Sequence, residues 1–560
     1  MPESSRIPQA DWWRDAVVYQ VYPRSFADAN NDGTGDVRGI TSRLDHLSTL
    51  GVDAVWISPW YPSPLADGGY DVADYCDIHP DFGTVADADE LIAAAHARGL
   101  RVLLDLVPNH TSDEHPWFQA ALVSAPGSPE RARYVFRDGR GPGGDLPPNN
   151  WPSLFGGSAW QRVTEADGTI GQWYLHLFAV KQPDLDWANP EVSDLIVEVQ
   201  RFWFDRGIDG FRVDVADSLA KHQDFPDTPL DPDTGFGTWR QAPGMPMWDQ
   251  PELEAIQRRW REVADAYDPP RIYVAESNSP SKFRYLEAGR LHSAFTFDGL
   301  ACEWDATSLR HMITHSLTTH AAAGAPATWV LGNHDTPRPV TRYGKAFTGW
   351  GFLPDGPDPE RLVFSEWMYP WPTDATRGRR RARAALLLQA ALPGSLYIYQ
   401  GEELGLEEVE DLPVASLQDP IFRGSNGRHR GRDGCRVPLP WSGTEPPFGF
   451  SRDAASWLPQ PARWAGRTAS DQDADPDSVL ALYRTTLALR RELGLGRGDL
   501  AWVDDLPHGV LGFTRDAGVT CLVNVGSDAP FPLPRGRVLL ASGPLADGAL
   551  PPDTAVWLAR

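Results

Sequence analysis

The stretch Ile208-Asp209-Gly210-Phe211-Arg212-Val213-Asp214-Val215 has the composition of a β-strand that ends in charged residues. Residues two apart on a strand point to the same face, so Arg212 and Asp214 should lie side by side. A guanidinium at this spacing keeps its neighbouring carboxylate ionised, as a carboxylate nucleophile requires at neutral pH. Taken alone, the pair is more typical of a structural ion pair, so its role depends on the rest of the chain.

Similar runs recur along the chain and alternate with segments of helical period. The expected strands are residues 16–22, 52–58, 101–107, 208–215, 271–276, 293–297, 328–332 and 395–400. The helical runs include residues 40–50, 89–98, 191–205, 251–267, 308–322 and 379–391. Strands that alternate with helices form parallel sheets, and eight such units predict an α/β fold, the (β/α)8 TIM barrel.

Two long segments interrupt this alternation and a third follows it. Residues 111–172 are rich in Pro, Gly, Asn and Trp and predict an inserted, partly β B domain after the third strand. The barrel would then comprise residues 1–110 and 173–497, with a loop subdomain at about 403–476. Short apolar runs between turn residues in 498–560 predict a C-terminal antiparallel β domain.

Composition excludes several classes of function. The 51 Lys+Arg against 76 Asp+Glu give a net charge of −25, which repels nucleic acids and anionic membranes. The four cysteines are far apart and form no CxxC pair, so neither a zinc site nor a disulfide framework is indicated. No apolar stretch is long enough to span a membrane, and the N-terminus lacks a signal-like apolar region. We therefore expect a cytoplasmic protein without nucleic-acid or membrane partners; the sequence leaves its oligomeric state open.

Polar side chains gather where the predicted strands end. The third strand continues into 105–110, the fourth carries Arg212 and Asp214, the fifth ends at Glu276, and the seventh leads into Asn333-His334-Asp335. A single such residue is usually a turn residue or a helix cap. In a TIM barrel, however, the carboxyl ends of the strands surround the active site. Several of them together therefore predict a catalytic site.

These motifs, with residues 182–185 and 432–436, resemble glycoside hydrolase family 13, the α-amylase family, and within it the α-glucosidases and oligo-1,6-glucosidases. The resemblance extends over residues 12–441. It implies that Asp214 is the nucleophile, Glu276 the acid/base and Asp335 a third carboxylate that holds substrate hydroxyls. The sugar site would be lined by His110, Arg212 and His334. The expected substrates are small oligosaccharides, and no organic cofactor is required.

The two carboxylates also suit this chemistry on physical grounds. Retaining glycoside hydrolysis needs a nucleophile and an acid/base about 5–5.5 Å apart, which neighbouring barrel strands can supply. Asp214 lies beside Arg212 and should be ionised, whereas Glu276 follows the apolar Val274 and Ala275 and has no adjacent cation. Glu276 is therefore expected to be the protonated partner.

The loop around Tyr70 predicts the size of the substrate. By resemblance, Asp71 holds a terminal glucose while Tyr70 stacks beneath it, and Arg432 pairs with Asp71. Phe155 and Phe178 resemble aromatic walls of the same pocket. A pocket closed in this way admits only a non-reducing end. The alternatives are a turn role for Asp71, a loop ion pair for Arg432 and core roles for both phenylalanines.

Departures from the family pattern bear on specificity. Asp217-Ser218 stands where endo-acting amylases usually carry Lys-His, which argues against an endo-amylase. Val215 directly follows the expected nucleophile, and it resembles the residue that α-1,6-specific members have at this position, although α-1,4 enzymes can also have it. The 182–187 and 432–436 segments look closer to those of α-1,4-acting α-glucosidases, so we favour maltose-type α-1,4 substrates. The alternatives are an α-1,6-glucosidase, a transglycosylating or sucrose-acting relative and, in another class, a non-catalytic carbohydrate-binding homologue, which would typically lack the three carboxylates.

A separate loop after the first strand has the pattern of a cation site. Its oxygen donors recur at alternate positions, in Asp28, Asn30, Asp32, Thr34 and Asp36. The spacing resembles an EF-hand loop without its closing Glu. In related α-glucosidases such a loop binds a structural Ca²⁺, so we expect Ca²⁺ or Mg²⁺ here; a metal-free turn is the alternative.

Overall fold

The computed structural model describes residues 10–559 apart from 166, 230–243, 280, 355, 358–370 and 528. Its centre is an eight-stranded parallel sheet with the order β10-β13-β1-β2-β3-β7-β8-β9. The strands are β1 (Val17–Val21), β2 (Ala54–Ile57), β3 (Arg101–Leu106), β7 (Gly210–Val213), β8 (Ile272–Ala275), β9 (Ser293–Ala294), β10 (Thr328–Val330) and β13 (Ser395–Tyr399). Just beyond β9, the amide of Thr296 donates to the carbonyl of Thr328 at 2.8 Å and joins the two ends of the sheet. This closure confirms the predicted barrel.

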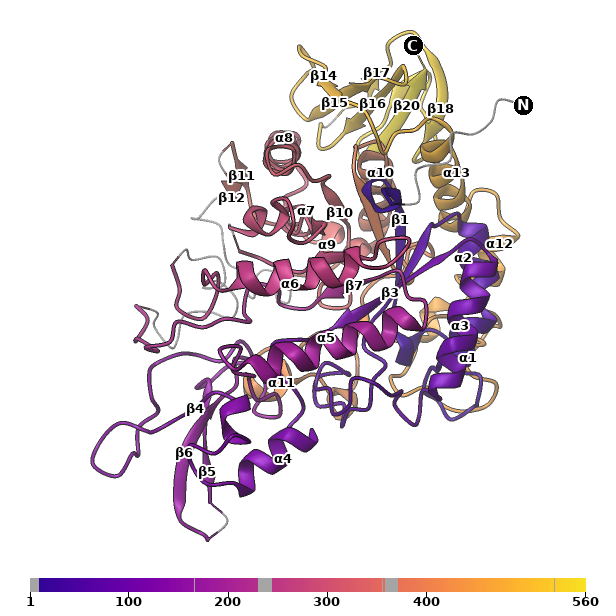
Figure 1. The fold of residues 1–560 in the computed structure, drawn as a ribbon. Helices are drawn as coiled ribbons and strands as arrows, with labels where there is room; N and C mark the ends of the chain where they lie inside the picture. The colour runs from indigo at the N-terminus through magenta and orange to yellow at the C-terminus, as the bar shows by residue number, and fades with distance from the viewer. Residues whose placement is uncertain are drawn as a thin grey trace.

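Helices surround the barrel (Figure 1). The longer ones are α1 (Val37–Ser42), α2 (Leu44–Leu50), α3 (Val85–Ala97), α5 (Pro190–Asp205), α6 (Leu253–Asp265), α8 (Ala306–Ala322), α10 (Ala375–Ala390) and α13 (Val479–Glu492). Their starts follow sequence signals: Thr84 and Asp87 form a capping box at α3, and Asn189 caps α5 before Pro190. The single helix predicted at 40–50 is instead α1 and α2, because Arg43 leaves helical geometry at ψ 7°.

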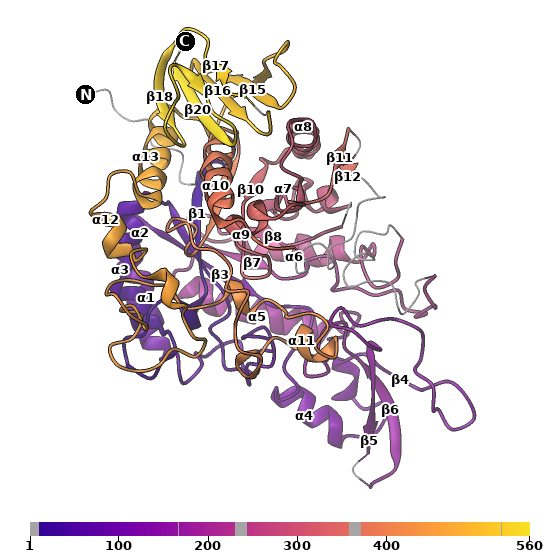
Figure 2. The ribbon, with the colours of Figure 1, turned by 180° about the vertical axis from the view of Figure 1, so that it is seen from behind.

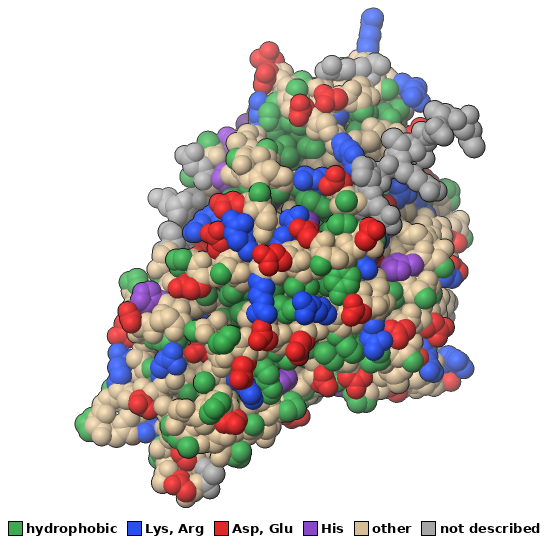
Figure 3. All heavy atoms as spheres, viewed as in Figure 1, with side chains coloured by type: hydrophobic (Ala, Val, Ile, Leu, Met, Phe, Trp, Pro, Cys, Tyr) green, Lys and Arg blue, Asp and Glu red, His purple; other side chains and the backbone are tan. Residues whose placement is uncertain are grey.

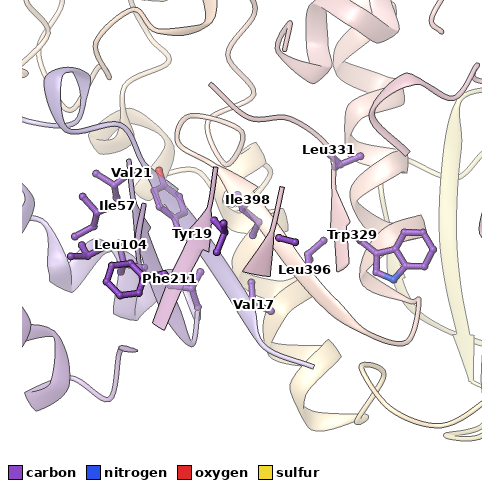
Figure 4. Close-up of a cluster of buried hydrophobic side chains, with 14 of the residues drawn as sticks. Val17, Tyr19, Val21, Ile57, Leu104, Phe211, Trp329, Leu331, Leu396 and Ile398 are labelled. Carbon is purple, nitrogen blue, oxygen red and sulfur yellow. The ribbon is translucent and has the colours of Figure 1, made fainter. Parts of the chain in front are cut away.

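Alternate residues of the barrel strands belong to two buried clusters. Val17, Tyr19 and Val21 belong to the large cluster that also includes helix residues, and Figure 4 shows them with their neighbours from other strands. Val18, between Val17 and Tyr19, belongs with Trp56 to a second cluster. Trp56 also bonds to Asp105. The strands therefore pack against helices on one face and present polar residues at their carboxyl ends on the other.

The insertion after β3 contains a small antiparallel sheet. Its order is β4-β6-β5, and its elements are α4 (Pro116–Val123), β4 (Phe136–Arg137), β5 (Trp160–Thr164) and β6 (Ile170–Leu175). The predicted limit at residue 172 falls within β6. Figures 1 and 2 place this insertion at one end of the molecule, far from the C-terminus.

The C-terminal residues form the predicted antiparallel β domain. Its five-stranded sheet has the order β14-β15-β16-β20-β18, with β14 (Leu500–Trp502), β15 (Val510–Arg515), β16 (Val519–Asn524), β18 (Arg537–Ala541) and β20 (Thr554–Ala559). Short ribbons pair β17 (Phe531–Pro532) with β19 (Ala549–Leu550) and β11 (Phe352–Leu353) with β12 (Gly356–Pro357). Trp557 anchors the domain on α10 by donating to the Leu387 carbonyl at 3.0 Å.

Loops and short helices complete the molecule. The remaining helices are α7 (Asp298–Ala301), α9 (Pro339–Gly344), α11 (Pro420–Gly424) and α12 (Ala469–Asp473), of which the last two lie in the predicted loop subdomain. Figure 3 shows acidic and basic side chains interspersed over one face. Among the described residues, no helix combines the length and apolarity that a membrane crossing needs.

Candidate active site

Arg212 lies at the centre of a buried cluster of carboxylates at the carboxyl ends of β3, β7 and β8. Its Nη1 is 2.6 Å from Oδ1 of both Asp105 and Asp214, and its Nη2 is 2.9 Å from Oε2 of Glu276. Its side chain is only 1% exposed. The ion pair predicted between Arg212 and Asp214 is therefore present, and it is one part of a larger charge network.

Glu276 has a cation beside it that its sequence neighbours did not indicate. Sequence neighbours alone left it without a cation, but β7 and β8 pair in parallel with Arg212 opposite Val274. This register brings the guanidinium to the residue two positions further along β8, which is Glu276. One arginine therefore serves both members of the predicted catalytic pair.

This shared charge changes the expected protonation of Asp214. Burial raises the pKa of Asp214 well above its usual range, Arg212 lowers it in part, and the negative charges of Glu276 and Asp105 raise it further. Burial likewise raises the pKa of Asp105 to about 6. Arg212 thus offsets only part of the effect of burial, whereas the sequence had suggested that Arg212 alone would keep Asp214 ionised. The negative charge of Glu276 on the same guanidinium therefore disfavours ionisation of Asp214.

Asp335 lies among cations and is the most open of the three carboxylates. Arg432 and Arg436 contact its Oδ1 at 2.8 and 2.9 Å, and its side chain is 28% exposed, against 10% for Asp214 and 8% for Glu276. Burial acts to raise the pKa of Asp335, but the guanidinium groups of Arg432 and Arg436 outweigh it and hold the pKa well below the usual range. Asp335 is therefore an ionised acceptor.

Histidine and tyrosine rings complete the polar part of the site. Tyr70 stacks on His334 with centroids 5.1 Å apart and donates to Asp105 at 2.9 Å. His334 Nε2 is 3.3 Å from Asp335. His110 contacts Gln182, and burial lowers the pKa of His110 to about 4. Burial also lowers the pKa of His334 well below its usual value. Both rings are therefore neutral at pH 7 and act as hydrogen-bonding groups.

The partner predicted for Arg432 requires a correction. Arg432 Nη2 contacts Asp67 at 2.6 Å, and Asp67 also accepts from Gln182 at 3.1 Å. Asp71 instead accepts the backbone N–H groups of Ala66 and Asp67 at 2.8 and 3.0 Å and is fully buried. It therefore organises the turn, which was the structural alternative. The turn carries Gly68 and Gly69 at φ 60° and 110°, and it points Asp67 toward Arg432.

The two predicted aromatic walls lie against the polar groups of the site. Phe155 and Phe178 meet edge to face at 5.7 Å, and each is 8% exposed. Phe155 lies 5.2 Å beneath the Arg432 guanidinium, and Phe178 lies 5.1 Å from His110. The structure thus brings together Asp214, Glu276, Asp335, Tyr70, His110, Phe155, Phe178, Arg212, His334 and Arg432 at one end of the barrel.

The same residues lie within a region that matches a known family. The model of the α-amylase catalytic domain matches residues 20–349 and 370–496. The chain belongs to the α-amylase family. Its match includes every barrel strand except the first residues of β1, so it spans the whole carboxylate cluster.

Within the α-amylase family, relatives with several names resemble the chain. A probable α-glucosidase of Rhizobium meliloti is 38% identical over 93% of this chain and 91% of its own. An oligo-1,6-glucosidase of Heyndrickxia coagulans is 37% identical over 89% of each chain. Among solved structures, the α-glucosyl transfer enzyme XgtA superposes with a TM-score of 0.82 at 35% identity over 98% of each chain. The chain is therefore a glycoside hydrolase of the α-glucosidase kind.

The predicted cation loop lies outside this cluster. Asp28 accepts from the amides of Asn31 and Gly33, and Asp36 accepts from those of Ala29, Asn30 and Gly39. Among the described residues, no group of three or more His, Cys, Asp or Glu is placed to hold a metal ion. The donor types of Asp28, Asn30, Asp32, Thr34 and Asp36 suit a hard cation, and Gly33 takes φ 92° at the sixth position, where EF-hand loops have glycine.

Sequence reasoning missed several residues that the structure adds to the site. Asp67 was not predicted, because Asp71 is nearer to Tyr70 along the chain. The glycine pair after Asp67 was a usable signal, since it marks the sharp turn that directs the Asp67 side chain toward Arg432. Asp105, Gln182 and Arg436 lie inside the motifs at 105–110, 182–185 and 432–436, but no local pattern marks them as site residues. Their contacts depend on neighbours in other strands and loops, and local pattern does not give those neighbours.

Proposed function

We propose that this protein is an exo-acting, retaining α-glucosidase that releases glucose from the non-reducing ends of short α-glucosides. The observation that carries the proposal is the single guanidinium of Arg212, which holds Asp214 and Glu276 side by side at 2.6 and 2.9 Å. Two buried carboxyl groups held side by side can supply the nucleophile and the acid/base that double displacement needs.

In the first step, an oxygen of Asp214 bonds to the anomeric carbon while the bond from that carbon to the glycosidic oxygen breaks. Glu276 gives its proton to the departing oxygen. In the second step, water attacks the anomeric carbon of the glucosyl ester, its proton passes to Glu276, and Asp214 leaves as a carboxylate. Asp335, ionised beside Arg432 and Arg436, is suited to accept hydrogen bonds from sugar hydroxyls.

Exo action is supported by the contacts of Arg432. This guanidinium contacts Asp67 after β2, Asp335 after β10 and Asp419 after β13. It thereby ties three loops together beside the sugar site. A chain that continued past this point would have to break these buried ion pairs, so a terminal sugar is the fitting substrate.

We propose that α-1,4 linkages are favoured, as the 182–187 and 432–436 segments indicate, with α-1,6 preference as the alternative. Initial rates on maltose, isomaltose, sucrose and an aryl α-glucoside test both proposals. A higher kcat/KM for maltose than for isomaltose supports the α-1,4 preference. The reverse order contradicts it without affecting the proposed α-glucosidase activity. Release of no glucose from the whole panel contradicts that activity and favours the non-catalytic homologue.

Glucosyl transfer is a second candidate, because XgtA, a solved structure at 35% identity, is named as an α-glucosyl transfer enzyme. A glucosyl ester on Asp214 can be captured by a sugar hydroxyl as well as by water. Product analysis at high maltose or sucrose concentration separates the two activities. Oligosaccharides or sucrose isomers as main products favour transfer, and free glucose favours hydrolysis.

We also propose that the loop containing Asp28, Asn30, Asp32, Thr34 and Asp36 binds a structural Ca²⁺ or Mg²⁺. The expected result is a lower melting temperature in EGTA or EDTA that is restored by the metal, with no such response in the Asp32→Ala variant. A melting temperature that is the same with chelator and with metal contradicts the proposal. It would instead favour the metal-free turn, whose carboxylates are already satisfied by backbone amides.

A further inference from the structure

Val215, the residue after Asp214, has a backbone conformation that β-branched residues rarely adopt. Its φ is 38°, where the side chain crowds the backbone and where glycine or asparagine is usual. The surrounding structure fixes this geometry, because Ser218 donates to the Val215 carbonyl at 2.9 Å. The side chain is 3% exposed and belongs to the same buried cluster as Phe155, Phe178 and Phe225.

The consequence of this conformation is the direction of one backbone amide. The N–H of Val215 donates to Oε2 of Glu276 at 3.0 Å. Arg212 Nη2 contacts the same oxygen at 2.9 Å. Two donors on one oxygen stabilise negative charge there, so a proton on this carboxyl group belongs on the other oxygen, Oε1.

We propose that Val215 is a positioning residue for the proton-transfer step: its strained backbone fixes Oε2 of Glu276 and so assigns Oε1 as the oxygen that carries and delivers the proton. This inference rests on the proposed role of Glu276 as acid/base. During the first step, the proton on Oε1 passes to the glycosidic oxygen, and the electron pair left on the carboxylate is stabilised at Oε2 by Val215 and Arg212.

The direct test replaces the Val215 N–H by an ester oxygen, with α-hydroxyvaline incorporated at position 215 of the full-length protein. The side chain is unchanged, and only the donor to Oε2 is lost. Because this donor stabilises the carboxylate of Glu276, its loss makes the proton harder to give up. The basic limb of the kcat/KM profile should then move upward by about one pH unit, and cleavage of phenyl α-glucoside should slow by about ten-fold. Cleavage of dinitrophenyl α-glucoside, whose leaving group needs no proton, should change little.

Ala216 offers a matched control. Its amide donates to the backbone carbonyl of Glu276 at 2.9 Å, so an ester at position 216 removes a hydrogen bond between the same two segments and leaves the carboxylate untouched. It should destabilise the fold to a similar degree but keep the basic limb at the wild-type pH.

Two results would overturn the proposal. One is a folded position-215 ester with an unshifted basic limb and equal losses on both aryl glucosides. The other comes from neutron diffraction on wild-type crystals, which needs no variant: a deuteron on Oε2 contradicts the assignment, and one on Oε1 supports it. If wild-type protein cleaves neither aryl glucoside, the proposed function fails instead, which is a separate outcome.

Discussion

At the scale of single residues, Arg212 shares one positive charge among Asp105, Asp214 and Glu276. The sequence predicted its pairing with Asp214, because residues two apart on a strand share a face. The contact with Glu276 follows from the register of β7 against β8, which local pattern does not encode. The candidate carboxylates were therefore predictable, and the guanidinium that Asp214 and Glu276 share was not.

Single substitutions can test whether Asp67 or Asp71 is the aspartate that supports the sugar site. The Asp67→Asn variant removes a charged partner of Arg432, and we expect kcat/KM for an aryl α-glucoside to fall about 10- to 100-fold. The Asp71→Asn variant alters only the turn and should lower the melting temperature while it leaves KM unchanged. The opposite pattern, with the larger kinetic loss in Asp71→Asn, would restore the original assignment of Asp71 to the sugar site.

At the scale of elements, the segment that follows β13 carries a buried acid, Glu402, that takes no part in the proposed chemistry. Glu402 accepts the Tyr399 amide at 3.1 Å, and burial raises the pKa of Glu402 to about 8. A carboxyl whose pKa is raised in the folded state stabilises the fold below its ordinary pKa of 4.5, and this contribution is lost as the pH rises through about 8.

The Glu402→Gln variant should therefore have a flatter pH dependence of stability between pH 4.5 and 8 than the wild type. We also expect a higher melting temperature than the wild type above pH 8, because no charge is then buried. Denaturant unfolding at a series of pH values measures both effects, with the exposed Glu492→Gln as the control. Parallel stability curves for wild type and Glu402→Gln would show that Glu402 does not retain a proton in the folded state.

The elements themselves were largely predictable, because buried apolar runs and helix caps are local signals. All eight barrel strands lie within their predicted ranges. Two departures have local causes: Arg43 divides the first predicted helix, and β6 continues past the predicted end of the insertion.

At the scale of the whole molecule, the C-terminal β domain is fastened to the barrel at Asp553. This residue accepts from Trp304 Nε1 at 3.0 Å and from Arg381 Nε at 2.7 Å and is buried. The sequence predicted the domain, but it gave no indication of these contacts, which join residues far apart in the chain.

The Asp553→Asn variant keeps an acceptor but loses the charge, so we expect a loss of about 1–2 kcal/mol in unfolding free energy. Asp547→Asn is a matched control, because Asp547 has a positive φ (49°) like Asp553 (58°) but is exposed. Both variants should retain the wild-type kcat at 25 °C. Equal stability of the two variants would show that the ion pair does not fasten the domain.

The central claim is that Asp214 becomes covalently glucosylated. Incubation of the wild-type protein with 5-fluoro-α-glucosyl fluoride, followed by digestion and mass spectrometry, tests it directly. The account predicts a fluoroglucosyl label on the peptide that contains Asp214 and on that side chain, and no label in the Asp214→Ala variant, which should also be inactive. A label on another residue would contradict the account, as would inverted stereochemistry of the released glucose.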